Sequence, residues 1–120
     1  KLMGNLFLLE MTAGLVEMLA LAKAMGIDAA EAASLLDWLN FGATVPARIR
    51  RILEADFSNP SWELAMARKD ARLMIEEAQR GEVLLDVVPA IAAAMDRWIE
   101  KGHAHDDWTI LAKDALTREG

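Results

Sequence analysis

The sequence predicts an all-α domain, and three observations support this fold class. The first 25 residues, KLMGNLFLLEMTAGLVEMLALAKAM, are apolar around most of a helix circumference. Later segments repeat apolar residues at threes and fours between capping residues, Gly and Pro. The strand-like run at residues 82–89 has no partner strand in the sequence. With 120 residues, 54% of them hydrophobic, the chain is large enough for one domain with a packed core.

The long first helix is expected to organise the domain. Four polar residues fall on one narrow line along it: Lys1, Asn5, Thr12 and Lys23. Glu10 and Glu17 fall on the opposite side, and the residues between the two lines are apolar. We therefore expect the helix to be buried, with the other helices wrapped around it. The two glutamates interrupt the apolar run too often for a membrane span, and Gly26 is expected to end the helix.

Two further helices are expected before residue 56. Asp28-Ala-Ala-Glu31 has the form of a capping box and opens a helix that runs to Asn40 and ends at Gly42. Its apolar residues are predicted to be buried: Leu35, Leu36, Trp38 and Leu39. Thr44-Val-Pro46 then opens a short helix that runs to about Ala55, because Pro is favoured in the first turn.

The second half of the chain is expected to hold three more helices. After an ordered loop at residues 57–62, a helix runs from about Trp62 to Arg80 and ends at Gly81. Residues 82–89 are interpreted as a buried extended connection that leads into a helix with Pro89 in its first turn. That helix ends at Gly102 and buries four residues: Ile91, Met95, Trp98 and Ile99. A last helix begins at about Asp107.

Composition narrows the function classes. The net charge of −6 makes a general nucleic-acid or anionic-membrane surface unfavourable. Cysteine is absent, which excludes thiolate chemistry and fits a reducing cytoplasm, where we expect the protein to be. The sequence shows no secretory signal, and because it begins with Lys1 rather than Met we expect a fragment or a processed product.

Several polar groups are candidates for a site. Lys1 and Asn5 are spaced i, i+4 and share a helix face, so they could converge on a small ligand, but exposed residues at a fraying helix start are the commoner explanation of this spacing. A cluster of three arginines could meet phosphates, but in an acidic protein a solvated face is the commoner reading: Arg48, Arg50 and Arg51. The loop from His103 to Asp107 matches no zinc-enzyme spacing, so no metal site is predicted.

The order of several motifs resembles one known family. Lys1-Leu-Met-Gly-Asn5 is followed by the run from Glu17 to Asp28, EMLALAKAMGID. This stretch is similar to the start of the C-terminal helical domain of the β-hydroxyacid dehydrogenases, the 3-hydroxyisobutyrate dehydrogenase family related to 6-phosphogluconate dehydrogenase. Further matches follow in the same order along the chain: Phe57, the dipeptide Lys69-Asp70, and Gly102 with Asp107-Trp108-Thr109.

The resemblance carries specific implications. Residues 1–120 would be a C-terminal substrate and dimerisation domain that lacks its N-terminal Rossmann domain. Lys1 would be the catalytic lysine, Asn5 would hold substrate, and Lys69 would lie on the cofactor side. The parent protein would transfer hydride between a 3-hydroxy acid and NAD or NADP. Imine reductases share the fold but usually place another residue at the lysine position, so Lys1 favours the hydroxyacid branch.

Two further expectations concern the isolated chain. Without the Rossmann domain it should bind neither NAD nor NADP usefully and should be inactive. The apolar first helix and four tryptophans exceed what a small monomer can cover, so we expect a homodimer or higher homo-oligomer: Trp38, Trp62, Trp98 and Trp108. The alternative reading is a free-standing helical interaction module without catalytic activity, in which the Lys1 and Asn5 pair is incidental.

Overall fold

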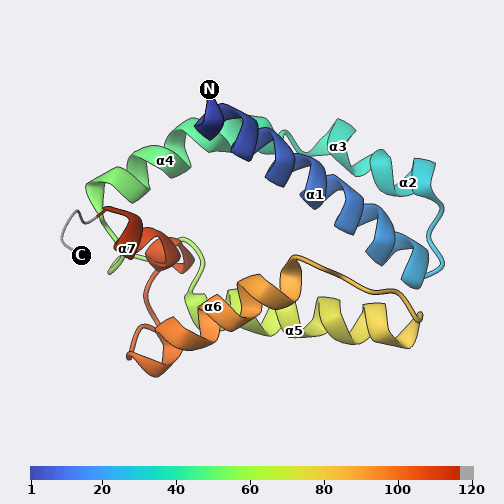
Figure 1. Ribbon diagram of the computed structural model, residues 1–120. Helices are drawn as coiled ribbons and strands as arrows, with labels where there is room; N and C mark the ends of the chain where they lie inside the picture. The colour runs from blue at the N-terminus through green and yellow to red at the C-terminus, as the bar shows by residue number, and fades with distance from the viewer. Residues whose placement is uncertain (117–120) are drawn as a thin grey trace.

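The computed structural model describes residues 1–116 and confirms the all-α prediction. Figure 1 shows two groups of helices on either side of an open centre. The elements in chain order are α1 (Leu2–Ala24), α2 (Ala29–Ala33), α3 (Leu35–Trp38), the 3₁₀ turn η1 (Phe41–Thr44), α4 (Val45–Glu54), α5 (Leu64–Arg80), α6 (Val88–Glu100), the 3₁₀ turn η2 (Trp108–Ala112) and α7 (Lys113–Leu116). Within the described residues the only strand-type pairing is an isolated bridge between Glu63 and Asp107.

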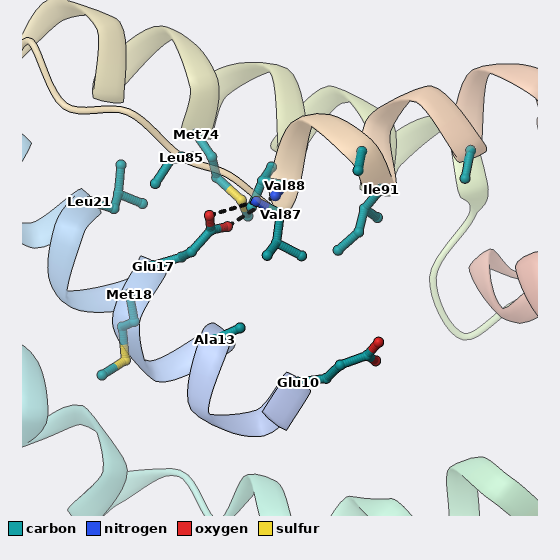
Figure 2. Close-up of a pocket in the computed structure, with 13 residues that line it drawn as sticks. Glu10, Ala13, Glu17, Met18, Leu21, Met74, Leu85, Val87, Val88 and Ile91 are labelled. Carbon is teal, nitrogen blue, oxygen red and sulfur yellow. Dashed lines mark hydrogen bonds between the residues drawn. The ribbon is translucent and has the colours of Figure 1, made fainter. Parts of the chain in front are cut away.

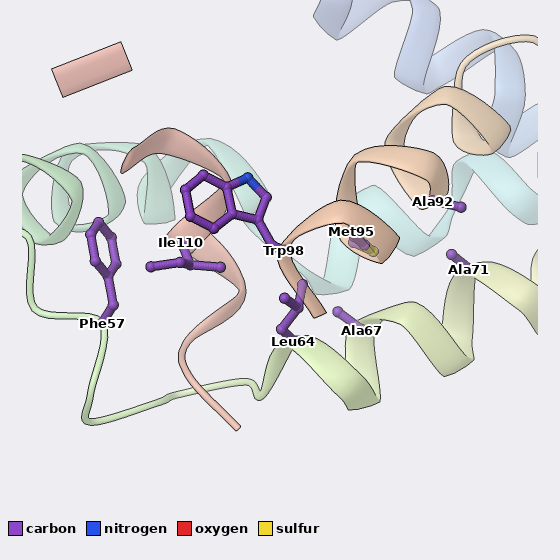
Figure 3. Packing of buried hydrophobic residues seen from close by; sticks show 8 residues of the cluster. All are labelled: Phe57, Leu64, Ala67, Ala71, Ala92, Met95, Trp98 and Ile110. Atoms are coloured by element: carbon purple, nitrogen blue, oxygen red, sulfur yellow. The ribbon is translucent and has the colours of Figure 1, made fainter. Parts of the chain in front are cut away.

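The core lies between α5 and α6 and is closed by η2 (Figure 3). Small residues on the facing sides, Ala67 and Ala71 on α5 and Ala92 on α6, let the two helix backbones approach closely. Larger side chains fill the end of the layer nearest η2: Phe57, Leu64, Met95, Trp98 and Ile110. The threes-and-fours pattern predicted for α5 is therefore confirmed, with Leu64, Ala67, Ala71 and Ala78 all buried.

The carboxylate of Asp107 joins three segments beneath this core. Its side chain is completely buried. One oxygen accepts hydrogen bonds from the Ser61 amide at 2.8 Å and the Ser61 hydroxyl at 3.0 Å. The other oxygen accepts from the Thr109 amide at 3.1 Å and from the Thr109 hydroxyl, and lies 3.6 Å from Nε of Arg51 on α4. The entry to α5, the start of η2 and the end of α4 are thus held by one charged group.

This arrangement explains two differences from the predicted boundaries. Residues 61–63 are not helical, because the backbone there pairs with residues 106–108, and α5 begins at Leu64 instead of Trp62. The last helix begins at Asp107 as predicted, but its first turn is the 3₁₀ turn η2. Asp107 caps this turn with its own side chain, which accepts the Thr109 amide.

The predicted burial of α1 is wrong within a single chain. Only Ala22 is buried, and Leu2 and Met3 are 85% and 83% exposed. The reason is that few helices reach it: among the described residues α1 packs mainly against α2 and α5. Figure 1 shows α2 and α3 along one side of α1 instead of wrapped around it. By length and composition α1 could also cross a membrane, with a mean hydropathy of 1.5, but Glu17 ties its middle to the folded domain.

The second predicted helix is also corrected. It breaks at Ser34 into α2 and α3 and ends at Trp38, and Gly42 lies within η1 instead of ending a helix. Asp28 occupies the predicted N-cap position, but its side chain makes no capping hydrogen bond. The residues predicted to be buried there are exposed: Leu35, Leu36, Trp38 and Leu39.

The remaining predicted boundaries are close to those observed. Pro46 and Pro89 lie in the first turns of α4 and α6. Gly26 and Gly102 follow α1 and α6 with positive φ, the conformation that Gly adopts without strain. In the connection at residues 82–89 only Leu85 is buried, whereas Leu84 is exposed, and Ile91 on α6 is also exposed.

The end of α5 meets the end of α1 at Gly81. A Cβ atom at Gly81 would overlap the backbone of Ala24, so only glycine allows this approach. The two helices therefore converge at their C-terminal ends and diverge toward their N-terminal ends, as Figure 1 shows.

We predict that Asp107→Asn lowers the free energy of unfolding by about 2–4 kcal/mol, because the amide group of Asn places a donor against the Ser61 or Thr109 donors. Urea denaturation measures this change. Asp37→Asn on α3, an exposed carboxyl, is the matched control and should change stability little. Equal stability of the two variants would contradict the role given to Asp107.

The same carboxylate predicts an acid sensitivity. Burial by itself raises the pKa of Asp107, but hydrogen bonds from Thr109 and Ser61 outweigh burial and lower the pKa from 3.8 to about 2. Because the folded-state pKa is the lower one, this contribution is fully present above pH 3.8 and is lost as the pH falls toward 2, by about 2 kcal/mol in total. Stability measured between pH 5 and pH 2 should fall less steeply in Asp107→Asn, and parallel curves would contradict this.

Candidate functional site

Lys1 and Asn5 lie on the first turn of α1. The Lys1 carbonyl accepts the Asn5 amide at 3.0 Å, which fixes the two residues one helical turn apart on the same face. Both residues are exposed, and they lie at the end of α1 that projects away from α5 (Figure 1). The structure thus brings the predicted catalytic and substrate-binding residues together, on a surface that is open in the single chain.

Lys69 lies on α5. It is exposed, between Arg68, which pairs with Asp96 on α6 at 2.8 Å, and the half-buried Asp70. The Lys69 ammonium makes no hydrogen bond or ion pair with the described residues. Within the described residues no hydrogen bond or ion pair joins Lys69 to Lys1 or Asn5.

An apolar groove of about 740 Å³ lies between α1 and the pair α5 and α6 (Figure 2). Its walls include Ala13, Met18 and Leu21 of α1, and Ile91 of α6. Two acidic residues of α1 also line it: Glu10 and Glu17. The groove exists because α1 and α5 diverge from their contact at Gly81 and leave the facing apolar side chains uncovered.

The carboxylate of Glu17 caps the N-terminus of α6 across this groove. It accepts hydrogen bonds from three successive amides, those of Asp86, of Val87 at 2.7 Å and of Val88 at 3.0 Å (Figure 2). The first amides of a helix have no partner within the helix, and a negative charge there is favourable. Glu17 is therefore the polar contact that joins α1 to α6.

Sequence reasoning missed this role of Glu17. It placed Glu17 on a polar line of the helix and in a family motif, without a partner. The available signal was a carboxylate within an apolar helix, together with a helix start at residues 87–89 that lacks a capping side chain of its own. Pairing the two would have predicted the contact.

The two histidines of the loop at residues 103–107 each pair with a nearby carboxylate. His103 Nδ1 lies 2.7 Å from a carboxylate oxygen of Asp106, and His105 Nδ1 lies 3.1 Å from one of Glu63. The two imidazoles therefore face different carboxylates. Among residues 1–116 there is no group of three or more His, Cys, Asp or Glu arranged to hold a metal ion.

Comparisons with known proteins identify the relatives of this fold. A family model described as "NADPH-dependent reductive aminase-like, C-terminal domain" matches residues 5–116, nearly the whole chain. No curated protein matches the sequence significantly.

Solved structures agree with this match. The reductive aminase from Aspergillus terreus in complex with NADPH and ethyl levulinate superposes with a TM-score of 0.79 at 20% identity, covering 93% of this chain and 42% of that one. The imine reductase from Myxococcus stipitatus in complex with NADP⁺ superposes with a TM-score of 0.76 at 18% identity, covering 92% of this chain and 43% of that one. A variant of the latter in complex with NAD⁺ gives 0.80 at 17% identity, with coverage of 92% and 41%. The chain spans about two fifths of the length of these proteins.

We predict that Glu17→Ala raises hydrogen exchange at the Val87 and Val88 amides by about tenfold or more, because both lose a charged acceptor. Glu17→Gln should give an intermediate effect, since its carbonyl oxygen can still accept one bond. NMR-detected exchange measures the change.

Glu10→Ala is the matched control for this prediction. It removes a carboxylate from the same helix and the same groove, but one without a hydrogen bond to the described residues. If Glu17→Ala and Glu10→Ala leave the Val87 and Val88 exchange rates equally unchanged, Glu17 does not cap α6.

Proposed function

The chain belongs to the family of C-terminal domains of NADPH-dependent reductive aminase-like proteins, and from this premise we propose that it is the helical domain of an NAD(P)-dependent oxidoreductase. The family match over residues 5–116 carries this proposal. The parent protein would add an N-terminal Rossmann domain, in keeping with the larger size of the structural relatives. The helical domain would supply substrate-binding residues and a dimer surface.

We assign to Lys1 the proton transfer of this reaction. When a hydroxyl is oxidised, hydride leaves carbon as a proton leaves oxygen, and a neutral amine can take that proton. In the reverse direction the ammonium donates the proton to the carbonyl oxygen. Asn5, one turn further along α1, would orient the substrate by hydrogen bonds from its amide group. The resemblance of Lys1 and Asn5 to the β-hydroxyacid dehydrogenase pattern supports a 3-hydroxy acid as the substrate.

In this proposal the N-terminal Rossmann domain of the parent protein makes most of the contacts to the nicotinamide cofactor. The described residues contain no strand followed by a glycine-rich turn and a helix, the usual cradle for a dinucleotide pyrophosphate. These residues therefore do not by themselves fit NAD or NADP. Lys69 is the one residue here assigned to the cofactor side, where its ammonium would approach a nicotinamide held by the Rossmann domain.

A second candidate reaction is the reduction of an imine. The family match favours it, because reductive aminase-like proteins give the family its description. Lys1 lies outside the matched residues 5–116, so the match is silent about the residue that separates the two chemistries. Both reactions deliver hydride to an sp² carbon, and they differ in the heteroatom that is protonated.

We also propose that the protein is a homodimer or a higher homo-oligomer that associates through α1. Large apolar side chains of α1 are exposed on every side, which is unfavourable in water and typical of an interface: Leu2, Met3, Leu6, Phe7, Leu8, Leu9, Met11, Leu15, Val16 and Leu19. The tryptophans contribute less than expected, because Trp98 is buried and Trp62 stacks edge-to-face on Trp108 at 5.4 Å. Trp38 alone of the four is largely exposed, at 85%.

An interaction module without catalytic activity remains the alternative to an enzyme. It would use the same apolar face of α1 but would not need Lys1 or Asn5. Substitutions at these two exposed residues therefore separate the alternatives.

We predict that Lys1→Ala in the parent protein lowers kcat by about 10²–10⁴-fold, because a positioned proton-transfer group is lost. Cofactor affinity and thermal stability should change little, since the Lys1 side chain is exposed and makes no hydrogen bond or ion pair with residues 2–116. Asn5→Ala should chiefly raise KM, with a smaller loss of kcat. Steady-state kinetics with a panel of 3-hydroxy acids measures both effects.

Lys23→Ala, on the other end of the same helix, is the control. A kcat of Lys1→Ala within a fewfold of the wild-type value would show that Lys1 is only a helix-end charge. It would also leave the imine reaction, assayed with the same variants, as the better candidate.

We predict a mass of at least two chains for this protein at micromolar concentration, against the 13.2 kDa of one chain. Leu6→Glu and Leu9→Glu should shift the equilibrium toward monomer, because each places a charge on the exposed face of α1. Sedimentation velocity measures the masses. Wild-type protein that sediments as a monomer would contradict the proposal.

A further inference from the structure

We propose that a polar cavity beside α4 binds an oxyanion of the phosphate class. The cavity has a volume of about 370 Å³ and is lined by Arg48, Arg50, Arg51, Glu54, Asp56 and Ser61, with Thr44 and Ala47. It contains none of Lys1, Asn5 and Lys69, so the proposal does not rest on the proposed function. The sequence did not decide between a solvated face and a phosphate site for the three arginines, and the fold places all three around one cavity.

Two of the arginines are held in place by the fold. The Arg48 guanidinium carbon lies 5.1 Å from the ring centroid of Trp108, a distance at which a cation is attracted to the ring face. On Arg51, Nη2 donates to the Asn59 carbonyl, and Nε lies 3.6 Å from the Asp107 carboxylate. Side chains that are already ordered lose less conformational entropy when a ligand binds.

These contacts leave many hydrogen-bond donors unused. Nε of Arg51 is buried without a hydrogen-bond acceptor. Within the described part of the chain, Arg48 makes only its ring contact, and Arg50 makes no hydrogen bond or ion pair. Each guanidinium carries five N–H groups in a planar fork that matches the oxygens of phosphate or carboxylate. A small oxyanion supplies acceptors for these unused donors.

The cavity also contains two carboxylates, which set the expected strength. Glu54 and Asp56 are exposed, whereas Arg51 is half-buried and lies beside the Asp107 carboxylate. Neither carboxylate is paired with an arginine within residues 1–116. Because Glu54 and Asp56 repel an anion and the Asp107 charge offsets Arg51, binding should be weak and strongly reduced by salt.

The test is an NMR titration of the chain with sodium phosphate at low ionic strength, with sodium chloride added to a parallel sample at matched ionic strength. Phosphate should shift amide resonances of α4 and of residues 58–61 saturably, and chloride should not. Sodium acetate in a third sample distinguishes a carboxylate-binding site from one that needs a phosphate. Shifts that are equal for phosphate and chloride would overturn the proposal.

Two variants give effects of opposite sign. Arg50→Gln should weaken phosphate binding by about tenfold, because it removes a charged donor. Glu54→Gln should strengthen phosphate binding by about threefold, because it removes a repulsive charge from the cavity lining. Arg72→Gln and Glu76→Gln on α5 are the charge-matched controls. These two residues form an ion pair with each other, with 2.9 Å between Nη1 and Oε1, and neither lines the cavity.

The controls decide the interpretation. Circular dichroism should show that all four variants keep the wild-type helix content, since the substituted side chains are largely exposed. If each control changes phosphate affinity as much as its counterpart in the cavity, the effect is one of net charge and the proposed site is wrong. If Glu54→Gln weakens binding, the cavity is likewise not the site.

Discussion

The buried carboxylate of Asp107 is the contact on which the compact half of the molecule depends. A charge in a protein interior is tolerated only when donors surround it, and here Ser61, Thr109 and Arg51 provide them from three separate segments. The same contact sets the start of α5, the 3₁₀ turn of η2 and the position of α4. Through Arg51, it also shapes the polar cavity, so one interaction links the core to a surface feature.

The other half of the molecule is held more loosely, and this looseness bears on function. α1 is fixed where its end meets α5 at Gly81 and where Glu17 caps α6. Beyond these contacts it projects with apolar side chains exposed and with Lys1 and Asn5 at its free end. Exposed apolar side chains of this kind are unfavourable in water and are typical of a helix that other protein covers. A Rossmann domain and a second copy of the chain are the two partners proposed here.

The sequence predicts features that depend on neighbouring residues better than features that depend on distant contacts. Local signals were reliable: Pro46 and Pro89 mark helix starts, Gly26 and Gly102 follow helix ends, and the spacing of Leu64, Ala67 and Ala71 identifies the buried face of α5. These features depend on backbone conformation and on helix period, which neighbouring residues determine. Lys1 and Asn5 share a face for the same reason.

Features that depend on distant contacts were not predicted. The apolar character of α1 indicates that other protein covers it, but a single sequence does not say whether the same chain does so. The prediction that this chain buries α1 was wrong. Glu17 accepts hydrogen bonds from amides that lie 69 to 71 residues away in the sequence. Asp107 accepts hydrogen bonds from amides that lie 45 to 46 residues away. The three arginines could be read as a solvated face or a phosphate site until the fold placed them around one cavity.

The most direct test of the account is the fate of a deuteride from a nicotinamide cofactor labelled at C4. The parent protein is supplied with this cofactor and a 3-oxo acid, and the product is analysed by mass spectrometry. The account predicts one deuterium on the former carbonyl carbon of the 3-hydroxy acid, formed at a rate that Lys1→Ala reduces by about 10²-fold or more. Absence of label from the hydroxy acid, with label instead in the amine formed from a matched imine, would contradict the assigned chemistry, and absence from both products would contradict the oxidoreductase role itself.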